Sequence, residues 1–414
     1  MQLSGAIDLG IGPQARDLSR RSAERHGPIL ALAWALAAIA AVPALLRWSA
    51  PTPLAALSSG YIPFLFDYLI AALVCYGIYR YEATRLDESR AALLVFTVFL
   101  LTTMVNNVHH YNIDQTSSYF VSITNDAWQR ANHDLVIQLS PKVLPHSYRF
   151  LPDSIVRWME LARIDYAAAR DFYRLIVGLI LFYTIYRYAR LYCSYSGALL
   201  AMLLIAVTYP ISFEYYAGQL TDPLSHLSFV LAFIFLETGE FAALLTVLLI
   251  GSFTKETVLA MAGYYILFHS KERGYRWKAP VLGLSSIAVF LGVRMFVLHG
   301  APNYQEISQT NMIEQLRLNL FDPSWRAPFA LTACALLPVL ALAWKTTPLA
   351  LKRQVLYLLP VLFISSLFFS WLKESRNFMP MVFALAVVAG RYATSLALDV
   401  ETAAQAETTV ARSL

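Results

Sequence analysis

The segment 241–268 reads FAALLTVLLIGSFTKETVLAMAGYYILF and is almost wholly apolar, except for Lys255 and Glu256 near its middle. The two apolar arms, 241–251 and 257–268, are each shorter than the ~20 residues that cross a bilayer unaided. The pattern therefore predicts two short helices that meet at a charged apex. Because a charge at membrane depth is costly, we expect this apex to face other polar groups and to be functional.

The composition places the whole chain among polytopic membrane proteins. Of its 414 residues, 58% are hydrophobic and 14% are charged, whereas a soluble domain carries about 25% charged residues. The aromatic share of 14% is typical of proteins with many side chains anchored at the membrane interface. The net charge of +5 comes largely from short basic loops. It therefore reports membrane topology, and we expect no nucleic-acid partner.

The distribution of basic loops predicts the topology. Arginines precede the first apolar run, and every strongly basic short loop falls on the cytoplasmic side when the runs alternate across the membrane. The predicted fold is an all-α polytopic membrane protein with about twelve membrane segments, the two short helices near 241–268 included. A cytoplasmic tail over 1–28 precedes one transmembrane domain over 29–396, and a second cytoplasmic tail covers 397–414. The long external loop over 109–171 is expected to contain amphipathic helices.

With this topology, several charged and aromatic motifs fall on the outer face of the membrane. They come from separate parts of the chain and would meet at one surface. In chain order they are Asp114 with Tyr119, Tyr148-Arg149-Phe150-Leu151-Pro152, Tyr215-Tyr216, Thr221-Asp222-Pro223, Lys255-Glu256 and Glu374-x-Arg376-x-x-x-Pro380.

Several of these motifs also have a purely structural interpretation. Asp114 would start a surface helix, since acids favour helix N-termini. Asp222 would cap a helix whose first turn contains Pro223. Glu374 and Arg376 would belong to an ordinary charged turn.

The remaining charges have structural alternatives as well. An ion pair between Lys255 and Glu256 would stabilise the break between the two short helices. Arg149 would bind lipid headgroups or brace the external loop. Arg294, near the outer end of a predicted span, would extend its guanidinium to the interface.

Taken together, the motifs resemble the GT-C class of integral-membrane glycosyltransferases, particularly bacterial members with a long first outer loop. The resemblance covers 106–380 and is carried by the motifs jointly. Members of that class usually place the catalytic acid in the loop after the first span, so the resemblance makes two N-terminal spans of this chain an addition. It implies an enzyme of the cytoplasmic (inner) membrane that moves a sugar from a polyprenyl-phosphate-linked donor to an envelope acceptor on the outer side.

The resemblance also implies roles for individual residues. Asp114 would be the general base that removes the proton of the acceptor hydroxyl, with Asp126 and Asp222 as lesser candidates. Asp222 would bind sugar hydroxyls. Tyr215 and Tyr216 would stack on a sugar ring.

The basic residues would bind the phosphate of the donor. Arg149, Lys255 and Arg376 would stabilise the negative charge that grows on the leaving phosphate. Glu256 and Glu374 would orient those cations or hold the acceptor.

The expected partners are membrane lipid, the polyprenyl-phosphate carrier, a glycan, lipid or protein acceptor, and other envelope-assembly proteins. No fixed metal-ligand spacing is evident, so a divalent cation is left open and no other cofactor is expected. Two other functions would use the same outer charges: a transporter or flippase of a lipid-linked or anionic substrate, and a non-catalytic scaffold of envelope polysaccharide assembly. The absence of internal repeats and the one-sided placement of the charges favour the enzyme over the transporter.

Overall fold

A computed structural model of the chain describes residues 126–212, 220–297, 312–321, 336–372 and 374–395. All regular secondary structure within these ranges is helical, which confirms the predicted all-α class for this part of the chain. The apolar runs before residue 126 lie outside the described ranges. So do Asp114, Tyr215 and Tyr216.

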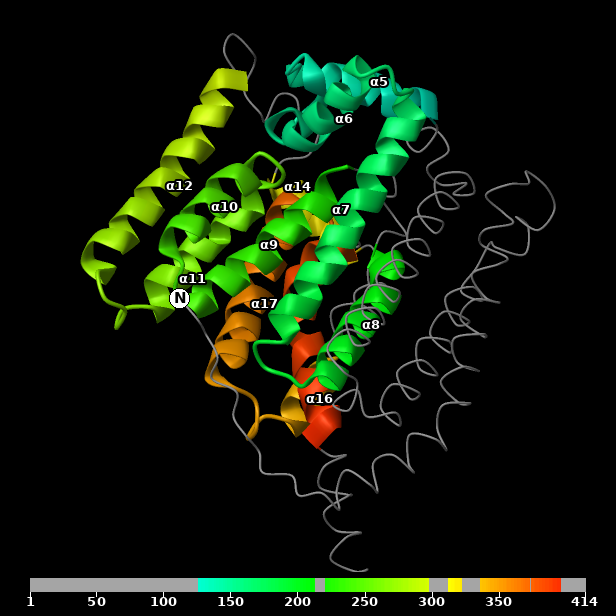
Figure 1. Cartoon of the computed structure of the whole chain (residues 1–414). Helices are drawn as coiled ribbons and strands as arrows, with labels where there is room; N and C mark the ends of the chain where they lie inside the picture. The colour runs from blue at the N-terminus through cyan, green and yellow to red at the C-terminus, as the bar shows by residue number, and fades with distance from the viewer. Residues whose placement is uncertain (1–125, 213–219, 298–311, 322–335, 373, 396–414) are drawn as a thin grey trace, which may run out of the picture.

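The predicted external loop contains helices, as expected. Helix α5 spans Asp126–Ile137 and helix α6 spans Leu151–Leu161, with the 3-10 turns η3 (Pro141–Val143) and η4 (His146–Tyr148) between them. The two helices lie together at one end of the molecule, beside the ends of α7 and α12 (Figure 1).

A buried histidine ties the two loop helices to each other. His133 of α5 lies 2.8 Å from an oxygen of Asp153 and 3.1 Å from an oxygen of Glu160, both on α6. Burial raises the pKa of Asp153, and the hydrogen bond from His133 opposes that rise. The loop is therefore folded around polar contacts of its own.

Three consecutive helices form the centre of the bundle. Helix α7 spans Tyr166–Ala189, α8 spans Tyr195–Ser212 and α9 spans Thr221–Thr238, and α7 packs against both of the others. Helix α9 ends at Gly239, whose φ of 73° is a left-handed conformation that glycine adopts without steric strain. The chain then turns sharply into the next helix.

The two predicted short helices are present. Helix α10 covers Phe241–Ser252, and the 3-10 turn η5 (Glu256–Leu259) leads into α11 (Ala260–Phe268). Between them Lys255 is extended, with φ −164° and ψ 124°. This break divides what would otherwise be one long apolar helix and forms the charged apex.

Three described helices are long and apolar enough to cross a membrane: α12 (Tyr275–Val297), α17 (Leu349–Phe369) and the last helix, Ser375–Ser395. Helix α12 packs against α10 and α11, and its other side exposes large apolar side chains such as Leu284 (67%) and Phe296 (72%). Such a surface fits contact with lipid chains. The total of about twelve segments stays a prediction.

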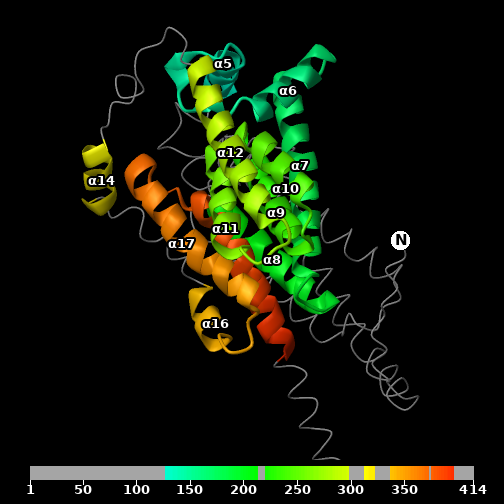
Figure 2. The same ribbon diagram turned by 90° about the vertical axis from the view of Figure 1, so that its left-hand side faces the viewer.

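Two short helices flank α17. Helix α16 (Leu337–Leu342) precedes it, and α14 (Met312–Phe321) lies beside its far end (Figure 2). The Asn319 amide donates to the carbonyls of Ser366 and Ser370 at that end, and its oxygen accepts from the Leu372 N–H.

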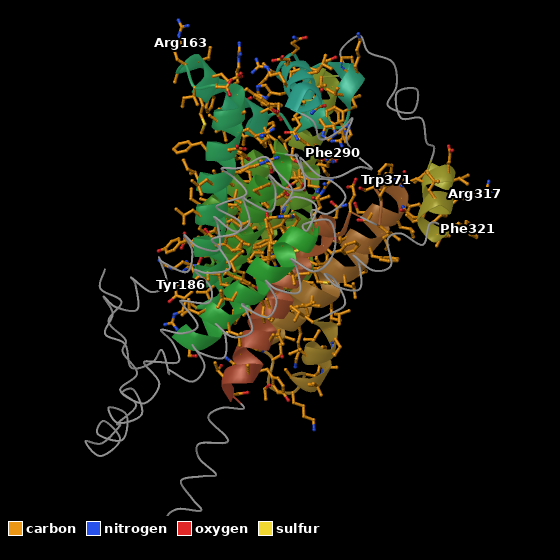
Figure 3. All side chains as sticks on the ribbon, turned by 90° about the vertical axis from the view of Figure 1, so that its right-hand side faces the viewer. Arg163, Tyr186, Phe290, Arg317, Phe321 and Trp371 are labelled. Atoms are coloured by element: carbon orange, nitrogen blue, oxygen red, sulfur yellow. The ribbon has the colours of Figure 1, made fainter. Side chains whose placement is uncertain are left out.

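Figure 3 shows Trp371 on the side of the bundle that faces α14. The hydrogen bonds of Asn319 to Ser370 and Leu372 hold the chain just before the last helix.

The last helix approaches α8 backbone to backbone at Gly390 and Gly197. A Cβ added to Gly390 would lie 2.2 Å from the Gly197 carbonyl oxygen, closer than atoms tolerate. We expect Gly390→Ala to push the helices apart and to cost about 1–3 kcal/mol of unfolding free energy, measured as a lower unfolding temperature in detergent.

Gly292 provides the matched control for this substitution. It lies on α12, and a Cβ there would meet nothing within 4 Å. Gly292→Ala should therefore leave the unfolding temperature unchanged or slightly higher, because alanine favours helix. Equal effects of the two alanines would contradict the packing argument.

Candidate functional site

The charged residues predicted on one face come together from separate segments. Asp222 lies in the first turn of α9, Lys255 at the break between the short helices, and Arg376 in the 3-10 turn η8 (Ser375–Phe378) that begins the last helix. Arg149 follows η4 in the loop between the helices α5 and α6. The sequence places these residues far apart, and the fold brings all four to one end of the bundle.

Asp222 is the centre of the buried part of this cluster. Its Oδ1 accepts a hydrogen bond of 2.9 Å from Lys255 Nζ, and its Oδ2 forms an ion pair of 3.0 Å with Arg376 Nε. The Asp222 side chain is 0% exposed. Lys255 Nζ also donates to the Asn377 side-chain oxygen at 2.6 Å. One carboxylate thus joins the starts of two helices to the apex.

The contacts of Asp222 decide between two interpretations of the Asp222-Pro223 pair. Helix α9 begins at Thr221, and the residue before it, Leu220, makes no side-chain capping bond. Asp222 is inside the helix, and its oxygens contact cations. The capping interpretation is therefore wrong. Binding of sugar hydroxyls by Asp222 stays a prediction.

A second ion pair joins the external loop to the apex. Arg149 donates from Nε and Nη2 to the two Glu256 oxygens at 3.0 and 2.8 Å, a two-point contact that orients both groups. Neighbouring side chains of an extended chain point to opposite sides, so Lys255 turns toward Asp222 while Glu256 turns toward Arg149. The interpretation in which Lys255 and Glu256 pair with each other is wrong.

Glu374 also contacts a cation that it was expected to orient. One of its oxygens lies 3.1 Å from Arg376 Nη2 and accepts a 3.0 Å hydrogen bond from the Ser370 hydroxyl. Arg376 is thus flanked by two carboxylates, those of Asp222 and Glu374. The turn that contains Glu374 and Arg376 is therefore not an ordinary solvent-exposed charged turn, since Arg376 is only 2% exposed.

Exposure increases across the cluster from Asp222 toward the loop. The side chains of Asp222 and Arg376 are 0% and 2% exposed, whereas those of Glu256 and Arg294 are 22% and 26% exposed. Arg294 Nη2 lies 4.0 Å from the Glu256 carboxylate. A ligand would therefore reach the cluster through Arg149, Glu256 and Arg294 before it could reach Asp222.

Counted over the residues that the structure describes, the charge balance of this site is positive. Four cations, Lys255, Arg376, Arg149 and Arg294, face three carboxylates, Asp222, Glu374 and Glu256. Burial, together with the charges of Arg149 and Arg376, lowers the pKa of the nearby His146 imidazole to about 3. That ring is neutral at pH 7 and adds no charge. A site with surplus positive charge and partial exposure favours an anionic ligand.

Sequence reasoning missed a histidine behind Arg376. His226 Nε2 lies 3.0 Å from the Arg376 carbonyl oxygen, which can only accept, so this nitrogen carries a proton. The other ring nitrogen lies 2.9 Å from the Tyr209 hydroxyl. His226 therefore holds the backbone that carries Arg376. Its position four residues after Asp222, on the same helix face, was a signal that could have found it.

The structure also changes the interpretation of Arg294. Its guanidinium lies over the rings of Tyr148 and Phe290, 4.8 and 3.5 Å from their centroids, in addition to its approach to Glu256.

Among the residues described, no group of three or more His, Cys, Asp or Glu side chains has an arrangement that could hold a metal ion. Metal dependence therefore stays open.

Comparisons with known proteins give no family for this chain. No protein-family model matches it, and neither the search of curated proteins nor the search of solved structures finds a match.

Proposed function

We propose that this protein is a membrane glycosyltransferase of the GT-C type, which takes its sugar from a polyprenyl-phosphate-linked donor. The observation that supports the proposal most is the cluster around Asp222, in which Lys255 and Arg376 converge beside the more exposed Arg149. Asp222, Lys255 and Arg376 are all assigned to this site from sequence, and Asp222 contacts both cations. Asp114, the proposed base, lies outside the described residues.

The proposed reaction needs a cationic surface of this kind. The acceptor hydroxyl loses its proton to Asp114 as its oxygen bonds to the anomeric carbon. The bond between that carbon and the phosphate oxygen breaks, and the electron pair leaves with the phosphate. Fixed cations in a water-poor site stabilise this developing charge more than water does. Arg149 presents the forked geometry that phosphate oxygens accept.

The buried residues have a positioning role in this proposal. Asp222 holds Lys255 and Arg376 at fixed positions, and Glu374 completes the hold on Arg376. Tyr215 and Tyr216 would stack on the sugar. The site would face outward from the cytoplasmic membrane, where a glycan, lipid or protein acceptor of the cell envelope is present.

A reconstitution experiment tests the proposed function. Protein in lipid nanodiscs is supplied with polyprenyl-phosphate-linked sugars and with candidate envelope acceptors, and the glycosylated product is detected by mass spectrometry. We expect product together with stoichiometric release of polyprenyl phosphate. The same protein in vesicles is tested for movement of a fluorescent lipid-linked sugar between leaflets. Lipid movement without product would favour the flippase, and neither activity would favour the scaffold.

A further inference from the structure

The Glu256 carboxylate occupies a place suited to a ligand anion. It receives two hydrogen bonds from Arg149, and Arg294 approaches the same oxygen to 4.0 Å. It is also more exposed than the other anion at the centre of the cluster, with 22% of its side chain accessible against 0% for Asp222. Of these two carboxylates, only that of Glu256 can be replaced from outside without opening the bundle.

The chain next to Arg149 is held in place by contacts that do not involve Glu256. The N–H of Leu151 donates to the Phe253 carbonyl at 3.2 Å, and the Phe150 and Phe253 rings pack with centroids 5.3 Å apart. These contacts pin the loop to the apex on the C-terminal side of Arg149. The backbone that carries Arg149 would therefore stay beside the apex if the Glu256 side chain rotated away.

From these contacts we infer that Glu256 is an internal counter-anion, which yields Arg149 and Arg294 to the phosphate group of an incoming ligand. The inference rests on the proposed function for the chemical class of the ligand, a polyprenyl phosphate or pyrophosphate. It adds a regulatory step: Glu256 is the partner of Arg149 in the empty site, and the ligand exchanges with this carboxylate. Arg149 then has an anionic partner at every stage.

Exchange favours a phosphate monoester because it offers more charge and more acceptors than a carboxylate. Polyprenyl phosphate, the monoester that sugar transfer releases, carries about −1.5 to −2 charges at pH 7 and three acceptor oxygens, whereas the sugar-linked donor is a diester with less charge. Glu256 reaches Arg149 at 2.8 Å but stays 4.0 Å from Arg294. A tetrahedral phosphate between the two guanidiniums could bond to both.

The test is whether one substitution, Glu256→Gln, tightens or weakens the binding of polyprenyl phosphate. In Glu256→Gln the competing charge is absent, so we expect binding of polyprenyl phosphate in nanodiscs to tighten about tenfold, which corresponds to about 1.4 kcal/mol. Glu256→Asp, with a shorter carboxylate, should tighten binding less. Arg149→Gln should weaken it by tenfold or more. If the carboxylate only orients Arg149, Glu256→Gln will weaken binding, and the inference is overturned.

Controls separate the local effect from others. Glu272→Gln removes the same charge from an acid that pairs with Lys278 instead, and it should leave affinity unchanged. Equal tightening in both variants would overturn the inference. Inorganic phosphate serves as the soluble probe: tightening with both probes assigns a site for the phosphate group itself, and tightening with the lipid alone assigns a lipid-linked ligand. If Glu256→Gln binds polyprenyl phosphate more tightly but the protein transfers no sugar, the proposed function is contradicted and this inference is retained.

Discussion

Replacing Asp222 with asparagine is expected to leave little folded protein in the membrane. The change removes the charge shared by Lys255 and Arg376, both nearly inaccessible to water. Breaking a buried ion pair by removing one partner costs about 3–5 kcal/mol, because the other charge stays buried without compensation. Lys255 loses its carboxylate partner and Arg376 loses one of two, Asp222 and Glu374, against a total stability of about 5–15 kcal/mol for a typical domain.

The effect can be assigned to charge by a double-mutant cycle. In Asp222→Asn/Lys255→Met the remaining cation, Arg376, keeps Glu374 as its partner. We expect the second substitution to restore part of the unfolding temperature that the first removes, measured for purified protein in detergent. If the two losses simply add, Asp222 is not the counter-charge of Lys255.

A surface pair provides the matched control for this cycle. Asp134 pairs with Arg130 at 3.2 Å, and 46% and 37% of these two side chains are exposed. Exposed pairs contribute about 0–1 kcal/mol, so Asp134→Asn should shift the unfolding temperature little. If the control lowers the unfolding temperature as much as Asp222→Asn does, burial of Asp222 does not explain the effect of its substitution.

The architecture at the apex was predictable because it depends on length and charge alone. The apolar arms 241–251 and 257–268 are each too short to span a bilayer, and the charged pair between them marks the place where one helix ends and the next begins. The structure has α10 and α11 on either side of Lys255, as the pattern predicts. The gathering of Asp222, Lys255 and Arg376 was predictable for a similar reason, since alternation across the membrane assigns each loop to one of two faces.

The pairing of charges within the site could not be predicted in the same way. Lys255 and Glu256 are adjacent in sequence, but the extended backbone at Lys255 sends their side chains to different partners. Arg294 has the sequence position of a residue at the lipid interface, yet it lies beside Glu256. The partners of Lys255, Glu256 and Arg294 depend on how separate segments are placed in three dimensions, which spacing along the sequence does not give.

The second large effect is expected at Asp114, whose assigned role rests on sequence. If it is the general base, Asp114→Asn removes the group that accepts the proton of the acceptor hydroxyl. Loss of a general base typically reduces turnover by about 10²–10⁴-fold. The amide keeps nearly the same volume and polarity, so expression and insertion should be unchanged. The cations of the cluster are untouched, so affinity for polyprenyl phosphate should also be unchanged.

This combination distinguishes a base from a residue that positions the donor. A donor-positioning acid would lower both turnover and carrier affinity, whereas a base lowers turnover alone. The measurement is kcat for sugar transfer beside the Kd for polyprenyl phosphate, in the same nanodiscs. Asp126, at the start of α5, is the alternative base that is nearest in sequence, and Asp126→Asn is the matched control. Near-normal turnover in Asp114→Asn, with the loss appearing in Asp126→Asn, would move the base to α5 and leave the phosphate site as described.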